Sequence, residues 1–234
     1  MTERKPLAGR VALVTGASRG LGAAAAARLT AAGAHTVLLA RTVGGLEETD
    51  DAVRAAGGEA TLCPVDLTAP GDLERALAAL AARFGRLDIL VSCAAALGTL
   101  GPAHQIADEA WRRVLDTNLT AAMRLIRATD PLLRRAPAGR AVFAAGYPAA
   151  RAYWGPYAAS KAALEALALA WAAETARTAL RVNLLDPGPM RTRLRAAAYP
   201  GEDPATLPPP DEAAARILRL VSPDCAAHGQ VFRS

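Results

Sequence analysis

Residues 11–22 read VALVTGASRGLG, an apolar run followed at once by a glycine-rich turn. Because no charged residue interrupts the run, it predicts a strand buried on both faces, as in a parallel sheet. The glycines would allow a tight turn and a close approach of the backbone to a pyrophosphate. The helix expected after them would point unpaired N–H groups at that anion. An ordinary tight loop could also explain the turn, but its place between the first strand and the first helix favours a nucleotide site.

The rest of the chain repeats this strand–helix order. Besides residues 11–15, apolar runs predict strands at 36–40, 60–65, 87–91, 140–145, 180–185 and 229–232. Helices are predicted at 20–32, 46–56, 72–84, 109–135, 156–177 and 211–221, and the fourth of these is one helix or two, broken near Pro131 and Pro137. The alternation predicts an α/β fold, with helices on both faces of a doubly wound, mostly parallel sheet of seven strands.

Composition points to one compact domain. The 234 residues are 52% hydrophobic and carry a net charge of +5, and no linker or internal repeat divides residues 1–234. Residues 189–210, rich in Pro, Arg and Gly, are expected to form a flexible substrate flap within that domain. The arginines are spread along the chain, which does not favour nucleic-acid binding. No secretory signal or membrane-spanning run is recognised and the three cysteines are far apart, so we expect a cytoplasmic protein without a metal site.

Lys161 is one of only two lysines in an arginine-rich chain, which suggests that an ammonium is required there. It follows Tyr157 by four residues, so the two side chains would share one helix face. A free phenol loses its proton near pH ~10, and a neighbouring cation lowers that pKa. The pair therefore predicts an acid/base group that works near neutral pH. The alternative is a packed tyrosine beside a solvated lysine.

The end of the second predicted strand bears on the choice of nucleotide. An acidic residue there would bind the ribose of NAD, but the chain reads Ala40-Arg41-Thr42. Arg41, together with Arg19 in the glycine turn, could hold a 2′-phosphate. The sequence therefore favours NADP over NAD, unless Arg41 is only a surface arginine.

The glycine turn TGxxxGxG and the YxxxK pair together resemble the short-chain dehydrogenase/reductase family, classical type, and the resemblance covers nearly the entire chain. Both asparagines of the chain, Asn118 and Asn183, fall on motif positions of that family. So do Asp66-Leu67, residues 88–91 and Asp186-Pro187-Gly188. The resemblance implies a single Rossmann domain with bound NADP.

The resemblance also implies roles for individual residues. Tyr157 would donate a proton to a carbonyl oxygen, Lys161 would lower the phenol's pKa and bind the nicotinamide ribose, and Asn118 would hold a proton-relaying water. Thr192 would contact the nicotinamide carboxamide. The complete cofactor-binding set expected is Gly16, Ser18, Arg19, Gly20, Leu21, Gly22, Arg41, Asp66, Leu67, Ala94, Tyr157, Lys161, Pro187, Gly188 and Thr192.

Two departures from the family pattern bear on activity. The family places a carbonyl-binding serine at the end of the fifth strand, where this chain has Ala144 and Ala145. Losing one such donor costs about 3 kcal/mol of transition-state stabilisation. Ser92, Tyr147 and Tyr153 are the hydroxyls that could replace it. The family's central NNAG also becomes SCAA at residues 92–95, which removes amide hydrogen bonds.

The sequence thus predicts an NADP(H)-dependent oxidoreductase that transfers a hydride between nicotinamide and a carbonyl or alcohol. The alternative is a catalytically silent NADP-binding sensor or partner subunit. Arg191, Arg193 and Arg195 suggest an acidic substrate such as an acyl thioester, unless they form a solvated or cofactor-facing strip. The resemblance implies a homodimer or homotetramer through the helices that contain Ala121 and Ala166.

Overall fold

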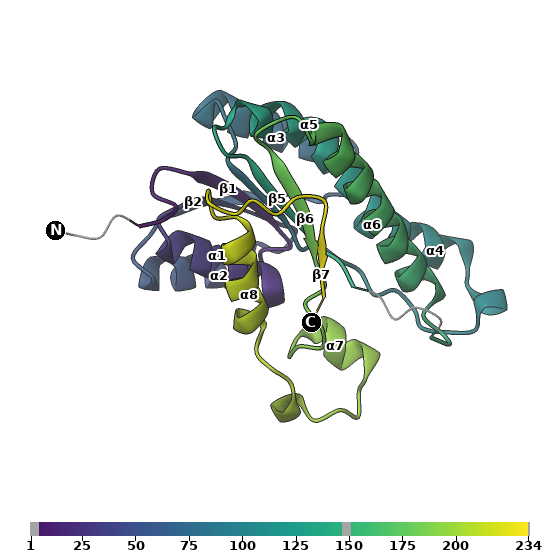
Figure 1. The fold of residues 1–234 in the computed structure, drawn as a ribbon. Coiled ribbons are helices and arrows are strands. Elements are labelled where there is room, and N and C mark those ends of the chain that lie inside the picture. Colours follow the sequence, from purple (N-terminus) through teal and green to yellow (C-terminus); the bar gives the residue numbers. More distant parts are fainter. Residues whose placement is uncertain (1–4, 147–150, 234) are drawn as a thin grey trace.

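A computed structural model describes residues 5–146 and 151–233. Its centre is a seven-stranded sheet with the order β3-β2-β1-β4-β5-β6-β7, and all six strand pairs are parallel (Figure 1). The predicted α/β class and doubly wound parallel sheet are therefore confirmed. The strands are β1 Val11–Thr15, β2 His35–Ala40, β3 Ala60–Pro64, β4 Ile89–Ser92, β5 Arg140–Ala144, β6 Arg181–Leu185 and β7 Val231–Phe232.

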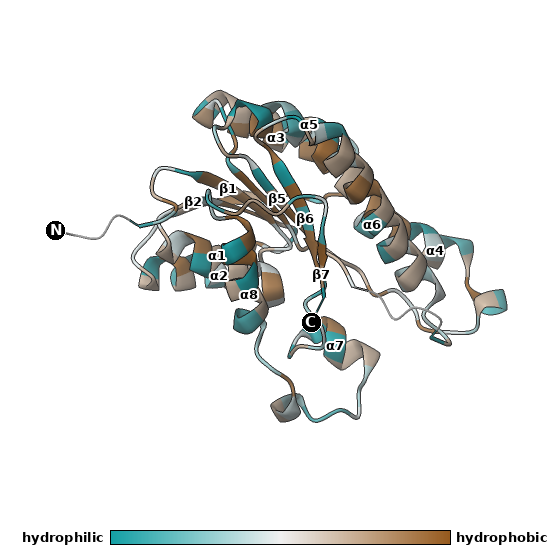
Figure 2. Cartoon of the chain, viewed as in Figure 1, coloured by the Kyte–Doolittle hydropathy of each residue, from teal (hydrophilic) through white to brown (hydrophobic). Residues whose placement is uncertain are grey.

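Helices cover both faces of this sheet. One layer holds α1 Gly20–Ala31, α2 Val43–Ala55 and α8 Pro210–Leu220. The opposite layer holds α3 Asp72–Phe84, α5 Ala121–Arg135 and α6 Gly155–Thr175, with α4 Asp108–Leu115 at its edge. Successive strand residues serve the two layers in turn: Leu13 packs into the core on the α3–α5–α6 side, and Val14 into the core on the α1–α8 side. Figure 2 shows the hydrophobic residues gathered along the strands between the layers.

Two segments contain structure that the sequence did not predict. The long segment 109–135 is interrupted at a π-helical turn, Asp116–Thr120, and not at Pro131, which lies inside α5. Residues 189–210, the expected substrate flap, contain the helix α7 Arg193–Ala198 and a 3₁₀ turn at Pro204–Thr206. Thr192 caps α7, because its hydroxyl accepts a hydrogen bond from the backbone N–H of Arg195 at 3.2 Å. The cap lies inside an arginine- and proline-rich stretch, in which no apolar periodicity predicted a helix.

No helix in the described part of the chain is long and apolar enough to cross a membrane. No group of three or more His, Cys, Asp or Glu in the same residues is placed to hold a metal ion.

Candidate active site

A cavity of about 1060 Å³ lies along the carboxyl ends of the strands. Parallel α/β sheets bind ligands at this edge, where the strand order reverses next to β1. Every cofactor-binding residue predicted from the sequence lines the cavity, namely Gly16, Ser18, Arg19, Gly20, Leu21, Gly22, Arg41, Asp66, Leu67, Ala94, Tyr157, Lys161, Pro187, Gly188 and Thr192. Asn118, predicted as catalytic, does not line it.

The glycine turn closes one end of the cavity. Gly16 has a φ of +66°, and a Cβ there would lie 2.8 Å from the backbone nitrogen of Ala94. A Cβ on Gly22 would lie 2.3 Å from the carbonyl oxygen of Gly16. Side chains at either position would collide with backbone, so the turn needs glycine. No side chain caps the start of α1, whose first N–H groups are thus left for an anion at the cavity.

Charged groups surround this end of the cavity. Arg19 and Arg41 are exposed, and neither forms an ion pair within the described part of the chain. Asp66 follows β3, and its Oδ1 accepts hydrogen bonds from the backbone N–H of Thr68 at 2.9 Å and from the Thr68 hydroxyl at 2.7 Å. These bonds lower the pKa of Asp66, and Arg41 lowers it further. Two free cations and one fixed carboxylate therefore face the same space.

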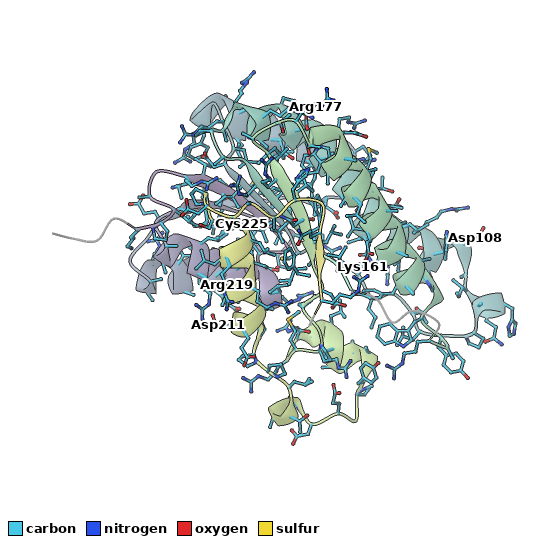
Figure 3. The ribbon with its side chains drawn as sticks, in the orientation of Figure 1. Asp108, Lys161, Arg177, Asp211, Arg219 and Cys225 are labelled. Carbon is cyan, nitrogen blue, oxygen red and sulfur yellow. The ribbon has the colours of Figure 1, made fainter. Side chains whose placement is uncertain are left out.

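Tyr157 and Lys161 meet at the other end of the cavity, on the first turns of α6. Lys161, which is labelled in Figure 3, is buried with 2% of its surface exposed, and its Nζ donates a hydrogen bond to the Ala144 carbonyl at 2.8 Å. The same Nζ lies 5.9 Å from the centroid of the Tyr157 ring. The sequence placed these groups on one helix face, and the structure brings both to the cavity wall.

Burial dominates the protonation of this pair. It raises the pKa of Tyr157 to about 12, with a further contribution from the Asp186 carboxylate. It lowers the pKa of Lys161 to about 8, a fall that Cys93 and Asp186 oppose. The net shift is upward and not downward as expected from the neighbouring lysine, because desolvation disfavours the phenolate. A phenol with this pKa keeps its proton at neutral pH.

Asn118 lies in the π-helical turn behind the cavity wall, 2% exposed. Its Oδ1 accepts from the Ala96 backbone N–H at 2.7 Å, and its Nδ2 donates to the Ala96 carbonyl and to Ser160 Oγ, each at 2.9 Å. The Ser160 hydroxyl in turn donates to the Tyr157 carbonyl at 2.8 Å. The Asn118 side chain is thus bonded to protein, and it ties the loop after β4 to the turn of α6 that carries Tyr157. Ser160 lies inside the YxxxK motif but was not predicted as a site residue from the sequence.

Of the three candidate replacements for the missing serine, the two that the structure describes do not line the cavity. Ser92 is 7% exposed and Tyr153 is 60% exposed, and neither lines it. Tyr147 lies outside the described residues. Ala144, Ala145 and Gly146, which have no side-chain donor, form the wall at this point.

An aromatic wall that the sequence analysis did not identify links α6 to the flap. The Trp154 ring centroid lies 5.7 Å from that of Tyr157 and 5.8 Å from that of Tyr199. The guanidinium of Arg195 sits 3.7 Å above the Tyr199 ring and bonds both carboxylate oxygens of Glu202 at 2.6 Å. Arg195 is therefore neutralised within the flap, which corrects the expectation that it attracts a substrate.

The helices expected at a subunit interface contain Ala121 and Ala166, which differ in exposure. Ala121 is 1% exposed and packs inside the core of the subunit. Ala166 is exposed on α6.

The chain resembles known proteins in both sequence and structure. A family model for short chain dehydrogenase matches residues 10–203. The chain is 35% identical to the uncharacterized oxidoreductase YciK of Escherichia coli K12 over 220 residues, which are 92% of this chain and 87% of YciK. The structure of a short chain dehydrogenase from Pseudomonas syringae superimposes with a TM-score of 0.94 and 37% identity, covering 100% of this chain and 97% of that one.

A third relative was solved with a nucleotide. The structure of a short chain dehydrogenase from Shigella flexneri 2a, complexed with NADP, has a TM-score of 0.93 and 32% identity over 99% of both chains. Matched by the family model over most of its length and by full-length structural neighbours above 30% identity, the chain belongs to the short-chain dehydrogenase/reductase family of oxidoreductases.

Proposed function

We propose that this protein is an NADP(H)-dependent oxidoreductase that transfers a hydride between the nicotinamide and a carbonyl or alcohol substrate. The observation that supports this most directly is that Tyr157 and Lys161 share one cavity with the glycine turn and Arg41. The cavity joins a proton donor to a dinucleotide cradle, as hydride chemistry on a carbonyl requires.

The residues present fit NADP. Gly16 and Gly22 leave open the backbone surface that a pyrophosphate would approach, and the uncapped start of α1 faces the same space. Arg19 and Arg41 would hold the 2′-phosphate, and the absence of an acidic residue after β2 removes the group that would bind a 2′-hydroxyl. The neighbour solved with NADP supports the same choice.

Bound NADPH would supply the hydride; the protein supplies the proton and the orientation. With a pKa of about 12, Tyr157 carries its proton at neutral pH and would deliver it to the carbonyl oxygen. Lys161, fixed to the Ala144 carbonyl, places positive charge beneath the phenol. Asn118 and Ser160 hold the backbone of Tyr157 in place from behind the wall.

Substrate-dependent oxidation of NADPH across a panel of carbonyl compounds tests this function. We expect turnover with at least one class of carbonyl, and about 10²–10⁴-fold slower turnover in Tyr157→Phe, because the general acid is lost. NADPH fluorescence should show binding in both proteins. Binding without turnover in the wild type, in Ala144→Ser and in Ala145→Ser would instead support the silent NADP-binding alternative, which the missing serine favours.

The substrate is proposed to be acidic, for example an acyl thioester. Arg191 and Arg193 line the cavity, are exposed and form no ion pair with any described residue. If they attract an anion, kcat/KM for an anionic carbonyl falls with rising salt, whereas kcat/KM for a neutral one does not. The variant Arg191→Gln/Arg193→Gln should lose this difference. Arg177→Gln, just beyond the far end of α6, is the control and should keep it (Figure 3). Equal salt dependence for both substrates would refute the idea.

We further propose that the protein forms a homodimer or homotetramer, in which the exposed face of α6 around Ala166 contacts a second copy of the chain. Light scattering should then give a mass above one chain, and Ala166→Arg should lower it. An unchanged mass would exclude this face.

A further inference from the structure

The end of β5 has a gap that a carboxylate fills. Gly146 follows β5 with a φ of +90°, and a Cβ there would lie 2.3 Å from Asp186 Oδ1 and 2.6 Å from its Cγ. Asp186 follows β6, the strand paired with β5 through Ala144 and Leu185. The carboxyl group thus occupies the space of a side chain at position 146, next to the alanines that stand where a serine was expected.

Hydrogen bonds with the main chain hold both the side chain and the backbone of Asp186. Asp186 Oδ1 accepts the Gly188 N–H at 3.0 Å, and the Asp186 N–H donates to the Phe232 carbonyl at 2.8 Å. The neighbouring Ala145 N–H donates to the Leu185 carbonyl at 2.8 Å. The acid is therefore held against the cavity by the sheet and by the turn that follows β6.

The catalytic pair lies close to Asp186 in the fold. Lys161 Nζ donates to the carbonyl of Ala144, which is paired with Leu185, the residue before Asp186, and the side chains of Tyr157, Lys161 and Asp186 line one cavity. Cys93, after β4, is a neutral thiol at physiological pH, because burial raises its pKa to about 12. Arg216 of α8 approaches the main chain of Asp186, with Nη1 3.5 Å from its carbonyl oxygen.

We propose that Asp186 is a positioning residue of this site: its carboxylate, seated beside Gly146, acts through Tyr157 and Lys161 to hold the phenol and the ammonium in their protonated forms. The consequence for the reaction rests on the proposed function. A protonated Tyr157 can give its proton to a carbonyl oxygen, whereas oxidation of an alcohol needs the phenolate to take one. Asp186 therefore raises the pH at which the phenolate becomes available for alcohol oxidation.

Lys161 offers a readout that requires neither substrate nor turnover. The chain contains two lysines, Lys5 and Lys161, so protein labelled with ¹⁵N-lysine should give two side-chain signals, assigned with Lys5→Arg. In the wild type the Lys161 signal should titrate near pH 8. In Asp186→Asn it should titrate about one pH unit lower, because the nearby negative charge is gone. Lys5, which is exposed, should not change.

Two controls keep the result interpretable. Asp211→Asn removes another carboxylate that lines the cavity, one paired with Arg28 at the start of α8, and should leave the Lys161 midpoint where it was. Asp186→Glu keeps the charge and should restore much of the wild-type midpoint. Thermal unfolding of each variant verifies that the protein is folded.

The outcomes separate the two proposals. An unchanged Lys161 midpoint in folded Asp186→Asn would overturn the role of Asp186, whatever the activity. If a substrate is found, the pH profile of kcat/KM for alcohol oxidation should move to lower pH by about one unit in Asp186→Asn, because the Tyr157 phenolate then forms at lower pH. An unchanged pH profile would likewise count against the proposal. A shifted midpoint without any turnover would support Asp186 and contradict the proposed function.

Discussion

The two ends of the sheet both bury charge, but they use it differently. At the amino end, Arg10 donates to the Asp88 carbonyl at 3.3 Å, and Arg140 donates to the Ser222 carbonyl at 3.0 Å. Asp88 Oδ2 accepts from the Val11 N–H at 3.0 Å. The charged groups at this end hold neighbouring segments of backbone together.

At the carboxyl end, the buried charge is less completely bonded. Lys161 has three donor protons, and the described residues accept one of them, through the Ala144 carbonyl. The Tyr157 hydroxyl has no hydrogen-bond partner among the same residues and faces the cavity. Buried groups with unused bonding capacity at a cavity are candidates for chemistry, whereas saturated ones stabilise the fold. The comparison can be tested by removing one group from each end.

The largest effect is expected from Lys161→Met. Burial holds the pKa of Lys161 near 8 in the folded protein, against 10.5 when exposed, so between these values the unfolded chain binds more protons. The wild type should therefore gain about 3 kcal/mol of unfolding free energy, relative to Lys161→Met, as the pH rises from about 8 to about 10.5. Urea unfolding at a series of pH values measures the difference.

Lys5→Met is the matched control, since Lys5 is the other lysine and is exposed. Its pH profile should run parallel to that of the wild type. Parallel profiles for Lys161→Met as well would mean that the Lys161 ammonium does not pay a burial cost in the folded state.

A smaller effect is expected at the amino end. Asp88→Ala leaves the buried Val11 N–H without an acceptor, which should lower the free energy of unfolding by about 1–3 kcal/mol. Asp88→Asn retains an acceptor oxygen and should lose less. NADPH affinity, measured by fluorescence at a concentration of denaturant where both proteins are folded, should not change. A weakened NADPH affinity would show that the two ends are coupled.

The sequence was sufficient for the parts of the molecule that depend on local pattern. The apolar run before the glycine turn, the alternation of strands and helices, and the four-residue spacing of Tyr157 and Lys161 are all local, and they gave the fold class and one wall of the cavity. The place of Asp186 depends on how β6 lies beside β5, which no short stretch encodes. The same holds for the ring contacts of Trp154 and Tyr199, which meet only after the flap folds back.

Protonation was the other property that the sequence could not supply. Spacing suggests attraction between the Lys161 ammonium and a Tyr157 phenolate, but desolvation depends on how much protein surrounds each group. Lys161 is 2% exposed because α6 packs against the sheet at β6, and the Lys161 side chain reaches across to the Ala144 carbonyl of β5. The Asn118–Ser160 link shows the same limit, since its partners are 42 residues apart in the chain.

The smallest effect, and the finest test of the comparison, is expected within α6 itself. Ser160→Ala removes the hydroxyl that joins Asn118 to the Tyr157 carbonyl, and should lower the free energy of unfolding by about 1 kcal/mol. Thr175→Val removes a buried hydroxyl at the other end of α6, one that donates to the Trp171 carbonyl at 2.9 Å, at a similar expected cost. Only Ser160→Ala should also lower kcat, with KM changed little, because only that hydroxyl fixes the turn that carries the proton donor. Equal kcat values in the two variants would mean that the backbone of Tyr157 is positioned by the packing of α6 alone.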